Sequence, residues 1–174
     1  MGRFLIVSLA VAAGAATLVA QASKEEIEGI RNFTRVDATV ACAGATAPEI
    51  IPALADRGYK SIINLRLATE TGALIDESRA AAEAANMKFI HLPLNGREPE
   101  MTVADDFIRA VTDPANQPVY INCGSANRVG ALWLAKRILV DKWDEAKALD
   151  EAKFIGLSSP VLEKFAMDYI AARR

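Results

Sequence analysis

The chain has 174 residues, and its 20 Lys and Arg residues are nearly balanced by 22 Asp and Glu residues, which gives a formal net charge of −2. This mild acidity argues against nucleic-acid binding and against attachment to an anionic membrane surface. With one histidine, two cysteines and no Cys-x-x-Cys motif, the sequence also offers no ligand set for a metal ion.

The first 22 residues have the features of a secretory signal peptide. Arg3 supplies a positive charge, residues 4–20 are mostly apolar, and Ala20-Gln21-Ala22 has the small-x-small pattern of a cleavage site. An uncleaved membrane anchor is the alternative, but this apolar run is shorter than the roughly 20 residues that span a bilayer. We therefore predict that residues 1–22 are a cleaved signal peptide. The mature chain is then periplasmic or secreted, without stable membrane insertion.

The mature chain, residues 23–174, is long enough for one domain with a complete hydrophobic core. It opens with a charged lead-in over residues 23–35, in which Glu25-Glu26-Ile27-Glu28 favours a helical turn. Apolar patterning then predicts strands over 36–43, 61–65, 88–92 and 119–121, and helices over 49–55, 76–85, 107–111, 129–140, 144–154 and 160–171. This alternation predicts an α/β fold with a mainly parallel central sheet flanked by helices.

Polar residues predict where two of these helices begin and end. Thr46 is placed to cap the helix over residues 49–55, and Gly58 is placed to close it. Thr102 and Asp105 have the spacing of a capping box for the helix that contains residues 107–111.

Arg66 directly follows a predicted strand, and ligands bind beyond the carboxyl ends of the strands in open α/β sheets. Arg66 is a candidate second contact for an anion. The alternative, which we favour, is an ion pair with Glu70 or Glu77 that pins the loop after the strand. His91 is the only histidine, and we expect it to be a packed, hydrogen-bonded residue rather than a ligand or a base.

Residues 119–133 are predicted to form a buried strand, a short loop and then a helix. The loop begins with Cys123 and ends with Arg128. Backbone N–H groups at the start of a helix converge on one space and, with the helix dipole, favour a thiolate there. The planar guanidinium of Arg128 fits two oxygens of a tetrahedral anion. Cys123 is therefore a candidate nucleophile and Arg128 a candidate oxyanion clamp. The alternative is a buried, inert cysteine followed by a solvated arginine.

This loop resembles the active-site loop of the cysteine-dependent phosphatases, the superfamily of tyrosine and dual-specificity phosphatases. The chain more closely resembles the bacterial phosphatase-like domain of the beta-lactamase hydrolase-like type, over roughly residues 36–170. Four segments carry this resemblance in order: 41–45, 58–66, 89–94 and 127–133. The resemblance implies a dual-specificity-phosphatase-like fold and hydrolysis of phosphomonoesters. It also implies a small phosphorylated or otherwise anionic substrate and no metal or organic cofactor.

The resemblance also implies roles for individual residues. Cys123 would form a cysteinyl-phosphate, and Arg128 would hold the phosphate oxygens together with the loop residues Gly124, Ser125, Ala126 and Asn127. Related phosphatases carry an aspartate as general acid in the region that corresponds to residues 93–100. Asn95 stands nearest that place and cannot transfer a proton. Glu98 is therefore the predicted acid and Glu100 the second choice, and the alternative is a solvated surface turn.

Three features depart from the phosphatase pattern. Four residues separate Cys123 from Arg128 where tyrosine phosphatases have five, and rhodanese-type sulfurtransferases use the shorter loop. Asn122 replaces the usual histidine, and Val129 replaces the usual hydroxyl residue. Ala126 stands where related loops often have glycine, so a positive φ there would be strained. These departures leave two alternatives open: a sulfurtransferase or persulfide-handling protein, and a catalytically inactive anion-binding module.

Cys42 and Cys123 are the only cysteines in the chain. In an oxidising compartment they could form a disulfide that blocks the nucleophile. Cys42 lies near the carboxyl end of its predicted strand, at the same edge of the sheet as Cys123. We therefore carry a disulfide between them as a hypothesis beside the free thiol that catalysis requires.

Overall fold

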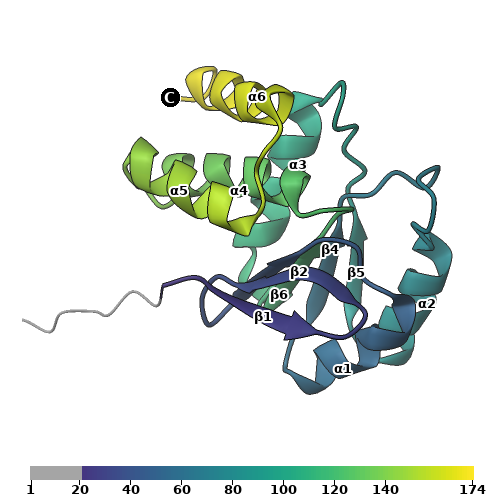
Figure 1. Ribbon diagram of the computed structural model, residues 1–174. Helices are drawn as coiled ribbons and strands as arrows, with labels where there is room; N and C mark the ends of the chain where they lie inside the picture. Colours follow the sequence, from purple (N-terminus) through teal and green to yellow (C-terminus); the bar gives the residue numbers. More distant parts are fainter. Residues whose placement is uncertain (1–20) are drawn as a thin grey trace, which may run out of the picture.

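The computed structural model describes residues 21–174, so the predicted signal peptide lies outside the described residues except for Gln21 and Ala22. Within this range six strands form one sheet (Figure 1). The strands are β1 (Ser23–Ile27), β2 (Ile30–Arg35), β3 (Val40–Ala43), β4 (Ser61–Asn64), β5 (Lys88–His91) and β6 (Val119–Asn122). The helices are α1 (Ile51–Asp56), α2 (Ile75–Ala84), α3 (Met101–Thr112), α4 (Asn127–Leu139), α5 (Glu145–Ile155) and α6 (Pro160–Ala171), with 3-10 turns at Pro48–Ile50 and Pro114–Asn116. No helix in residues 21–174 is long and apolar enough to cross a membrane.

The sheet has the strand order β1-β2-β3-β6-β4-β5. β6 pairs in parallel with both β3 and β4, and β4 pairs in parallel with β5. The β1–β2 and β2–β3 pairs are antiparallel. The predicted α/β fold with a mainly parallel central sheet is therefore confirmed. Because the parallel strands all end at one edge, the loops that follow β3, β4, β5 and β6 meet there.

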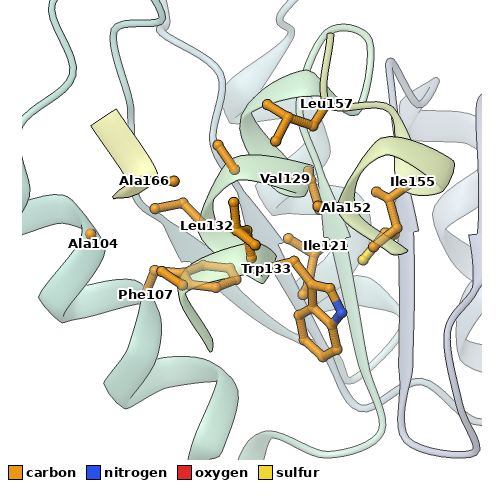
Figure 2. Packing of buried hydrophobic residues seen from close by; sticks show 14 of the residues in the cluster. Ala104, Phe107, Ile121, Val129, Leu132, Trp133, Ala152, Ile155, Leu157 and Ala166 are labelled. Carbon is orange, nitrogen blue, oxygen red and sulfur yellow. The ribbon is translucent and has the colours of Figure 1, made fainter. Parts of the chain in front are cut away.

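Helices cover both faces of the sheet and enclose two hydrophobic cores (Figure 1). α3, α4, α5 and α6 lie on one face, and α1 and α2 lie on the other. In the larger core, Leu132 and Trp133 of α4 lie near Phe107 of α3 and Ile121 of β6 (Figure 2). The smaller core includes Tyr120, which β6 directs to the opposite face. α4 is thus the central buried helix, and its N-terminus lies at the edge where β6 ends.

The charged lead-in is a β-hairpin, so the predicted helical turn over residues 25–28 is wrong. β1 pairs with β2, with Glu25 opposite Phe33, and the chain turns at Glu28 and Gly29. Phe33 is 1% exposed and belongs to the smaller core. Burial of β2 and its pairing with β1 and β3 outweigh the local helical preference of the glutamates.

Two of the predicted helix caps are also wrong. The Thr46 hydroxyl is hydrogen-bonded to the Tyr120 hydroxyl, 2.6 Å away, and caps no helix. α3 begins before Thr102, and Asp105 instead binds side chains at the C-terminal end of the chain. Gly58 follows the end of α1 as predicted, with a φ of 91°. The two wrong predictions were based on short polar patterns. In the folded chain, Thr46 and Asp105 bind side chains that are distant in sequence instead.

Candidate active site

The loop between β6 and α4, residues 123–126, is held from outside by the segment that follows β3; we call it the β6–α4 loop. The N–H of Ala45 donates to the carbonyl oxygen of Gly124 at 3.0 Å. Gly44 lies so close to the loop that a Cβ atom there would come within 3.1 Å of the Cα of Ser125. A side chain larger than glycine would push the two segments apart, so the outer wall of the loop depends on this contact.

Three backbone N–H groups of the β6–α4 loop and the start of α4 have no acceptor within the loop or the helix. Because the Gly124 carbonyl points to Ala45, the Ser125 N–H in the same trans peptide points the opposite way. Asn127 and Arg128 are the first two residues of α4, and N–H groups in the first turn of a helix have no intrahelical acceptor. These donors and the positive end of the helix dipole make the space inside the loop suited to an anion.

Ala126 has a left-handed backbone conformation at the N-cap of α4, with a φ of 71° and a ψ of 2°. Ala126 therefore has the positive φ that the sequence predicts to be strained. A left-handed conformation costs a residue such as alanine about 1 kcal/mol or more. The residue is fully buried. The loop thus contains a strained residue that its surroundings must hold in place.

Arg128 and Glu70 form a bidentate ion pair beside the β6–α4 loop. Nη1 of Arg128 donates to Oε1 of Glu70 at 2.5 Å, and Nη2 donates to Oε2 at 2.9 Å. A Cβ atom on Gly124 would lie 3.4 Å from Nη2, so the guanidinium directly adjoins the loop. Cys123 directly precedes Gly124, and its charge is one of the influences that raise the pKa of Arg128. The structure therefore brings Cys123 and Arg128 together, as the sequence predicts.

These contacts leave one edge of the Arg128 guanidinium for a ligand. Within residues 21–174, its Nε–H and one hydrogen of Nη2 donate to no oxygen atom. This edge matches two oxygens of a tetrahedral anion. Burial disfavours the charged form of Arg128, but its hydrogen bonds to Glu70 and the charge of Cys123 raise its pKa above the usual value. Arg128 is therefore a permanent cation next to the thiol.

Glu70 connects Arg128 to the predicted anion contact Arg66. Burial disfavours the charged form of Glu70, but hydrogen bonds from Arg128, the Leu67 N–H and Arg66 outweigh burial and lower its pKa to about 2. Arg66 is 6% exposed, and its other donors bind two carbonyl oxygens of the same loop. The ion pair between Arg66 and Glu70 is the interpretation that we favoured from the sequence.

The pairing of Glu70 with Arg128 was not predicted from the sequence. The two residues are 58 positions apart, and only the sheet topology brings the loop after β4 next to the start of α4. The available signal was weak: an acidic residue four positions after an arginine that follows a strand.

Three other residues of the predicted site and its surroundings have structural partners or face elsewhere. The side chain of Asn127 binds Ser158, donating from Nδ2 to Oγ at 2.9 Å and accepting from its N–H at 3.1 Å. His91 is hydrogen-bonded through Nε2 to a backbone carbonyl oxygen at 2.8 Å, as expected for a packed histidine. Asn122 lies on the side of the smaller core, across the sheet from Cys123, and its Oδ1 has no hydrogen-bond partner among the described residues.

The predicted general acid lies in the loop between β5 and α3. The Leu94 carbonyl accepts a hydrogen bond from Arg128 at 3.0 Å, and Gly96 lies near the aliphatic part of the same side chain. Glu98, two residues further on, is exposed. The loop therefore adjoins the site that contains Cys123, and the role of Glu98 stays a prediction.

Neither cysteine has the partners for a disulfide or a metal site. Both are free and buried, and Cys42 lies opposite Ile121 in the β3–β6 pair. Cys123 is two positions beyond Ile121, which places the two cysteine Cα atoms about 8 Å apart, beyond the range of about 4.4–6.8 Å for disulfides. Burial raises the pKa of the Cys42 thiol, which keeps it inert. Among residues 21–174, no group of three or more His, Cys, Asp or Glu side chains could hold a metal ion.

Comparison with known families gives one match that covers most of the chain. The family described as the DSP-PTPase phosphatase fused to NAD+ kinase matches residues 16–164. None of the curated proteins matches the chain.

Solved structures with the same fold include phosphatases from bacteria and yeast. A DUF442 protein of Shewanella putrefaciens has a TM-score of 0.71 and 18% identity, covering 84% of this chain and 95% of its own. The catalytic core of the PP-IP phosphatase Siw14 of S. cerevisiae, solved with citrate, has a TM-score of 0.68 and 21% identity. The match covers 82% of this chain and 87% of the Siw14 chain. TpbA of P. aeruginosa has a TM-score of 0.65 and 19% identity, and the match covers 87% of this chain and 89% of the TpbA chain. TpbA has also been solved with phosphotyrosine. At these identities the similarity establishes a dual-specificity-phosphatase-like fold.

Proposed function

The chain belongs to the family of DSP-PTPase phosphatases fused to NAD+ kinase, and we propose that it is a cysteine-dependent phosphatase that hydrolyses phosphomonoesters. The observation that carries this proposal is that Cys123 begins the loop that leads to Arg128 at the N-terminus of α4, where Nε of Arg128 binds no oxygen atom among residues 21–174. A nucleophile and a cation at the two ends of one loop can bind a phosphoryl group in line for attack. The complexes of Siw14 with citrate and of TpbA with phosphotyrosine support an anionic ligand in this fold.

In the proposed reaction, the Cys123 thiolate attacks phosphorus, an S–P bond forms, and the P–O bond to the leaving group breaks. The Arg128 guanidinium and the loop N–H groups stabilise the charge on the three remaining oxygens. Glu98 gives a proton to the leaving oxygen and later accepts one from the water that attacks the phosphocysteine. Cleavage of the S–P bond releases phosphate and restores the thiolate. Every step uses groups of the chain and water.

Hydrolysis of 4-nitrophenyl phosphate by the mature chain under reducing conditions tests this proposal. We expect turnover by the wild type and none by Cys123→Ser, because the hydroxyl of serine is a far weaker nucleophile than a thiolate. Cys42→Ala is the matched control, since it removes the other thiol and should retain activity. Equal rates for the wild type and Cys123→Ser would contradict the proposal.

The role of Glu98 has its own test. Glu98→Gln should lower kcat by about 10²-fold or more for an alkyl phosphate, whose leaving group needs a proton. The loss should be smaller for 4-nitrophenyl phosphate, whose leaving group departs readily as an anion. Glu100→Gln tests the second choice in the same way and should leave both rates unchanged if Glu98 is the acid. Equal losses for the two substrates would remove Glu98 as the acid.

Sulfur transfer is the second candidate, and the short spacing between Cys123 and Arg128 is the observation that favours it. The same preparations can be given thiosulfate and cyanide, with thiocyanate formation as the measurement. Thiocyanate formed through Cys123, without phosphatase turnover, would replace the first proposal by this one. Phosphate binding without turnover in either assay would favour the inactive anion-binding module.

We also propose that the protein is exported, which stays a prediction from its first 22 residues. The start of β1 at Ser23 supports this, because cleavage after Ala22 leaves the first strand whole. N-terminal sequencing of the protein recovered from the periplasm or medium should begin at Ser23. Full-length protein found only in the cytoplasm would contradict the proposal.

A further inference from the structure

Lys24 and Asn32 of the N-terminal hairpin link the β6–α4 loop to the end of α5. Lys24 Nζ donates to the side-chain oxygens of Asn32 and, at 2.8 Å, Thr34. Lys24 and Asn32 both donate to the carbonyl oxygen of Ile155, at 3.1 and 2.8 Å. Asn32 Nδ2 also makes a longer hydrogen bond of 3.4 Å to the carbonyl oxygen of Ser125. We call Lys24 and Asn32 the hairpin brace.

The chemistry of the two side chains determines how the brace is oriented. An ammonium group only donates hydrogen bonds, so Lys24 must face the oxygen of the Asn32 amide, and the NH₂ group must face the loop. Asn32 has a φ of 55°, which asparagine tolerates better than most residues. Ile155 is the last residue of α5, and a cation is favourable at this negative end of the helix dipole.

The brace lies next to the strained residue of the loop. A Cβ atom on Gly156 would lie 2.9 Å from Asn32 Nδ2 and 3.0 Å from the Cβ of Ala126. Glycine at this position therefore lets both side chains approach the end of α5. Ser125, whose carbonyl oxygen Asn32 binds, directly precedes Ala126.

We propose that Lys24 and Asn32 are positioning residues that hold the β6–α4 loop in its strained, anion-binding conformation. The catalytic consequence rests on the proposed phosphatase function, whereas the effect on the loop does not. Without the brace, the carbonyl oxygen of Ser125 loses its hydrogen bond from Asn32, and Ala126 relaxes out of the left-handed region. The loop N–H groups then lose their common direction.

Asn32→Asp tests the brace with a change of almost no volume. Aspartate tolerates a positive φ and still accepts from Lys24, but it turns an oxygen instead of a donor toward the two carbonyl oxygens. Hydrogen–deuterium exchange of the peptide that contains the β6–α4 loop should become about tenfold faster, with β4 and β5 unchanged. Arg35→Ala is the matched control. It breaks an ion pair on the same hairpin, where Arg35 is 47% exposed, and should leave loop exchange unchanged.

A rescue experiment distinguishes a role in positioning the loop from a general contribution to the stability of the fold. Ala126→Gly removes the strain, so exchange of the loop in the double variant Asn32→Asp/Ala126→Gly should return to within about threefold of the wild type. Lys24→Met is a second way to weaken the brace, because it frees the Asn32 amide to turn. It should change loop exchange in the same direction by a smaller factor, and it tests the brace if Asn32→Asp does not fold.

The KM for 4-nitrophenyl phosphate and the inhibition constant of inorganic phosphate should rise with loop exchange in Asn32→Asp, by about tenfold. Three results would overturn the brace: unchanged loop exchange, faster exchange across the whole sheet, or no rescue by Ala126→Gly. If the exchange results are as expected but the wild type has no phosphatase activity, the phosphatase proposal fails and the brace remains.

Discussion

The two ends of α4 each carry an arginine that pairs with a glutamate, and the two pairs differ in which guanidinium donors they leave without an acceptor. Arg128 is at the start of the helix and Arg137 near its end, with side chains 11% and 8% exposed. Glu70 binds Arg128 through Nη1 and Nη2. Glu151 binds Arg137 through Nε and Nη2, at 2.6 and 3.1 Å.

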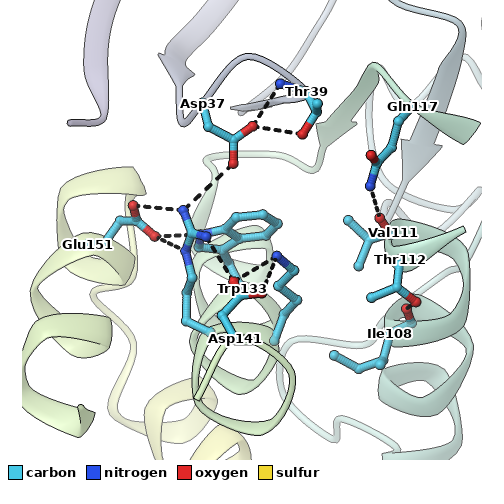
Figure 3. A network of polar contacts seen from close by, with 11 residues as sticks. Asp37, Thr39, Ile108, Val111, Thr112, Gln117, Trp133, Asp141 and Glu151 are labelled. Carbon is cyan, nitrogen blue, oxygen red and sulfur yellow. Dashed lines mark hydrogen bonds and ion pairs between the residues drawn. The ribbon is translucent and has the colours of Figure 1, made fainter. Parts of the chain in front are cut away.

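The donors of Arg137 are engaged by carboxylates, and its planar face packs on two tryptophan rings. Asp141 accepts from its Nη1 at 2.8 Å, and the guanidinium carbon lies 4.7 Å from the centre of the Trp133 ring and 4.1 Å from that of Trp143. Figure 3 shows Asp141 and Glu151 converging beside Trp133. At the other end of the helix, the pair with Glu70 leaves Nε of Arg128 without an oxygen acceptor among residues 21–174, and the loop before this arginine begins with Cys123. The two arginines therefore differ in which guanidinium nitrogens the glutamate binds. Arg137 is structural, whereas Arg128 keeps donors for a ligand.

The largest expected effect comes from Arg128→Met. Loss of the cation that faces the developing charge should lower kcat/KM by about 10³-fold. Steady-state kinetics with 4-nitrophenyl phosphate measure this, and urea unfolding measures stability, which should change much less than activity. A variant that loses stability and activity in proportion would make Arg128 another structural arginine.

Arg137→Met should instead lower stability and leave activity unchanged. Glu151 would keep the hydrogen bond from Trp133 Nε1 but would remain largely buried without a cation, which should lower the free energy of unfolding by about 3 kcal/mol. The kcat of the folded protein should stay unchanged. Arg109→Met is the matched control, because its pair with Asp106 is exposed and contributes little. A large loss of kcat in folded Arg137→Met would break the distinction between the two arginines.

Glu70→Gln should change how stability depends on pH. The pKa of Glu70 is lowered from 4.5 to about 2, so its ionised form stabilises the folded state above pH 4.5. This contribution, on the order of 2 kcal/mol, is lost as the pH falls from about 4.5 to about 2. The difference in unfolding free energy between the wild type and Glu70→Gln should therefore shrink over this range. A difference that does not vary with pH would mean that the ion pair with Arg128 does not form.

The smallest expected effect is that of Asp37→Asn, which lies beside Arg137. Asp37 Oδ2 is 3.9 Å from Arg137 Nη2 and its side chain is 31% exposed, so the ion pair is weak. Asparagine can still accept the hydrogen bonds that Thr39 donates to Oδ1. Urea unfolding should show that the free energy of unfolding falls by less than about 1 kcal/mol. A much larger loss would mean that Asp37 is a full partner of Arg137.

The comparison also shows which parts of the site can be predicted from sequence. The strand, loop and helix around Cys123 follow from a short apolar run, small residues and a strong helical pattern, all of them local signals. The pairing of Glu70 with Arg128 depends on the strand order β6-β4, which no local pattern encodes. The N-terminal hairpin was missed for the same reason, because its strands are stabilised by burial of Phe33 and by β3 rather than by the propensity of Glu25 and Glu26.

The most direct test of the account is to trap the covalent intermediate on Cys123. The mature wild-type chain would be mixed with 4-nitrophenyl phosphate, quenched in acid within milliseconds and analysed by peptide mass spectrometry. We predict one added phosphoryl group on the peptide that contains Cys123, and none on that peptide in Arg128→Met. Release of phosphate by the wild type with Cys123 never modified would contradict the account.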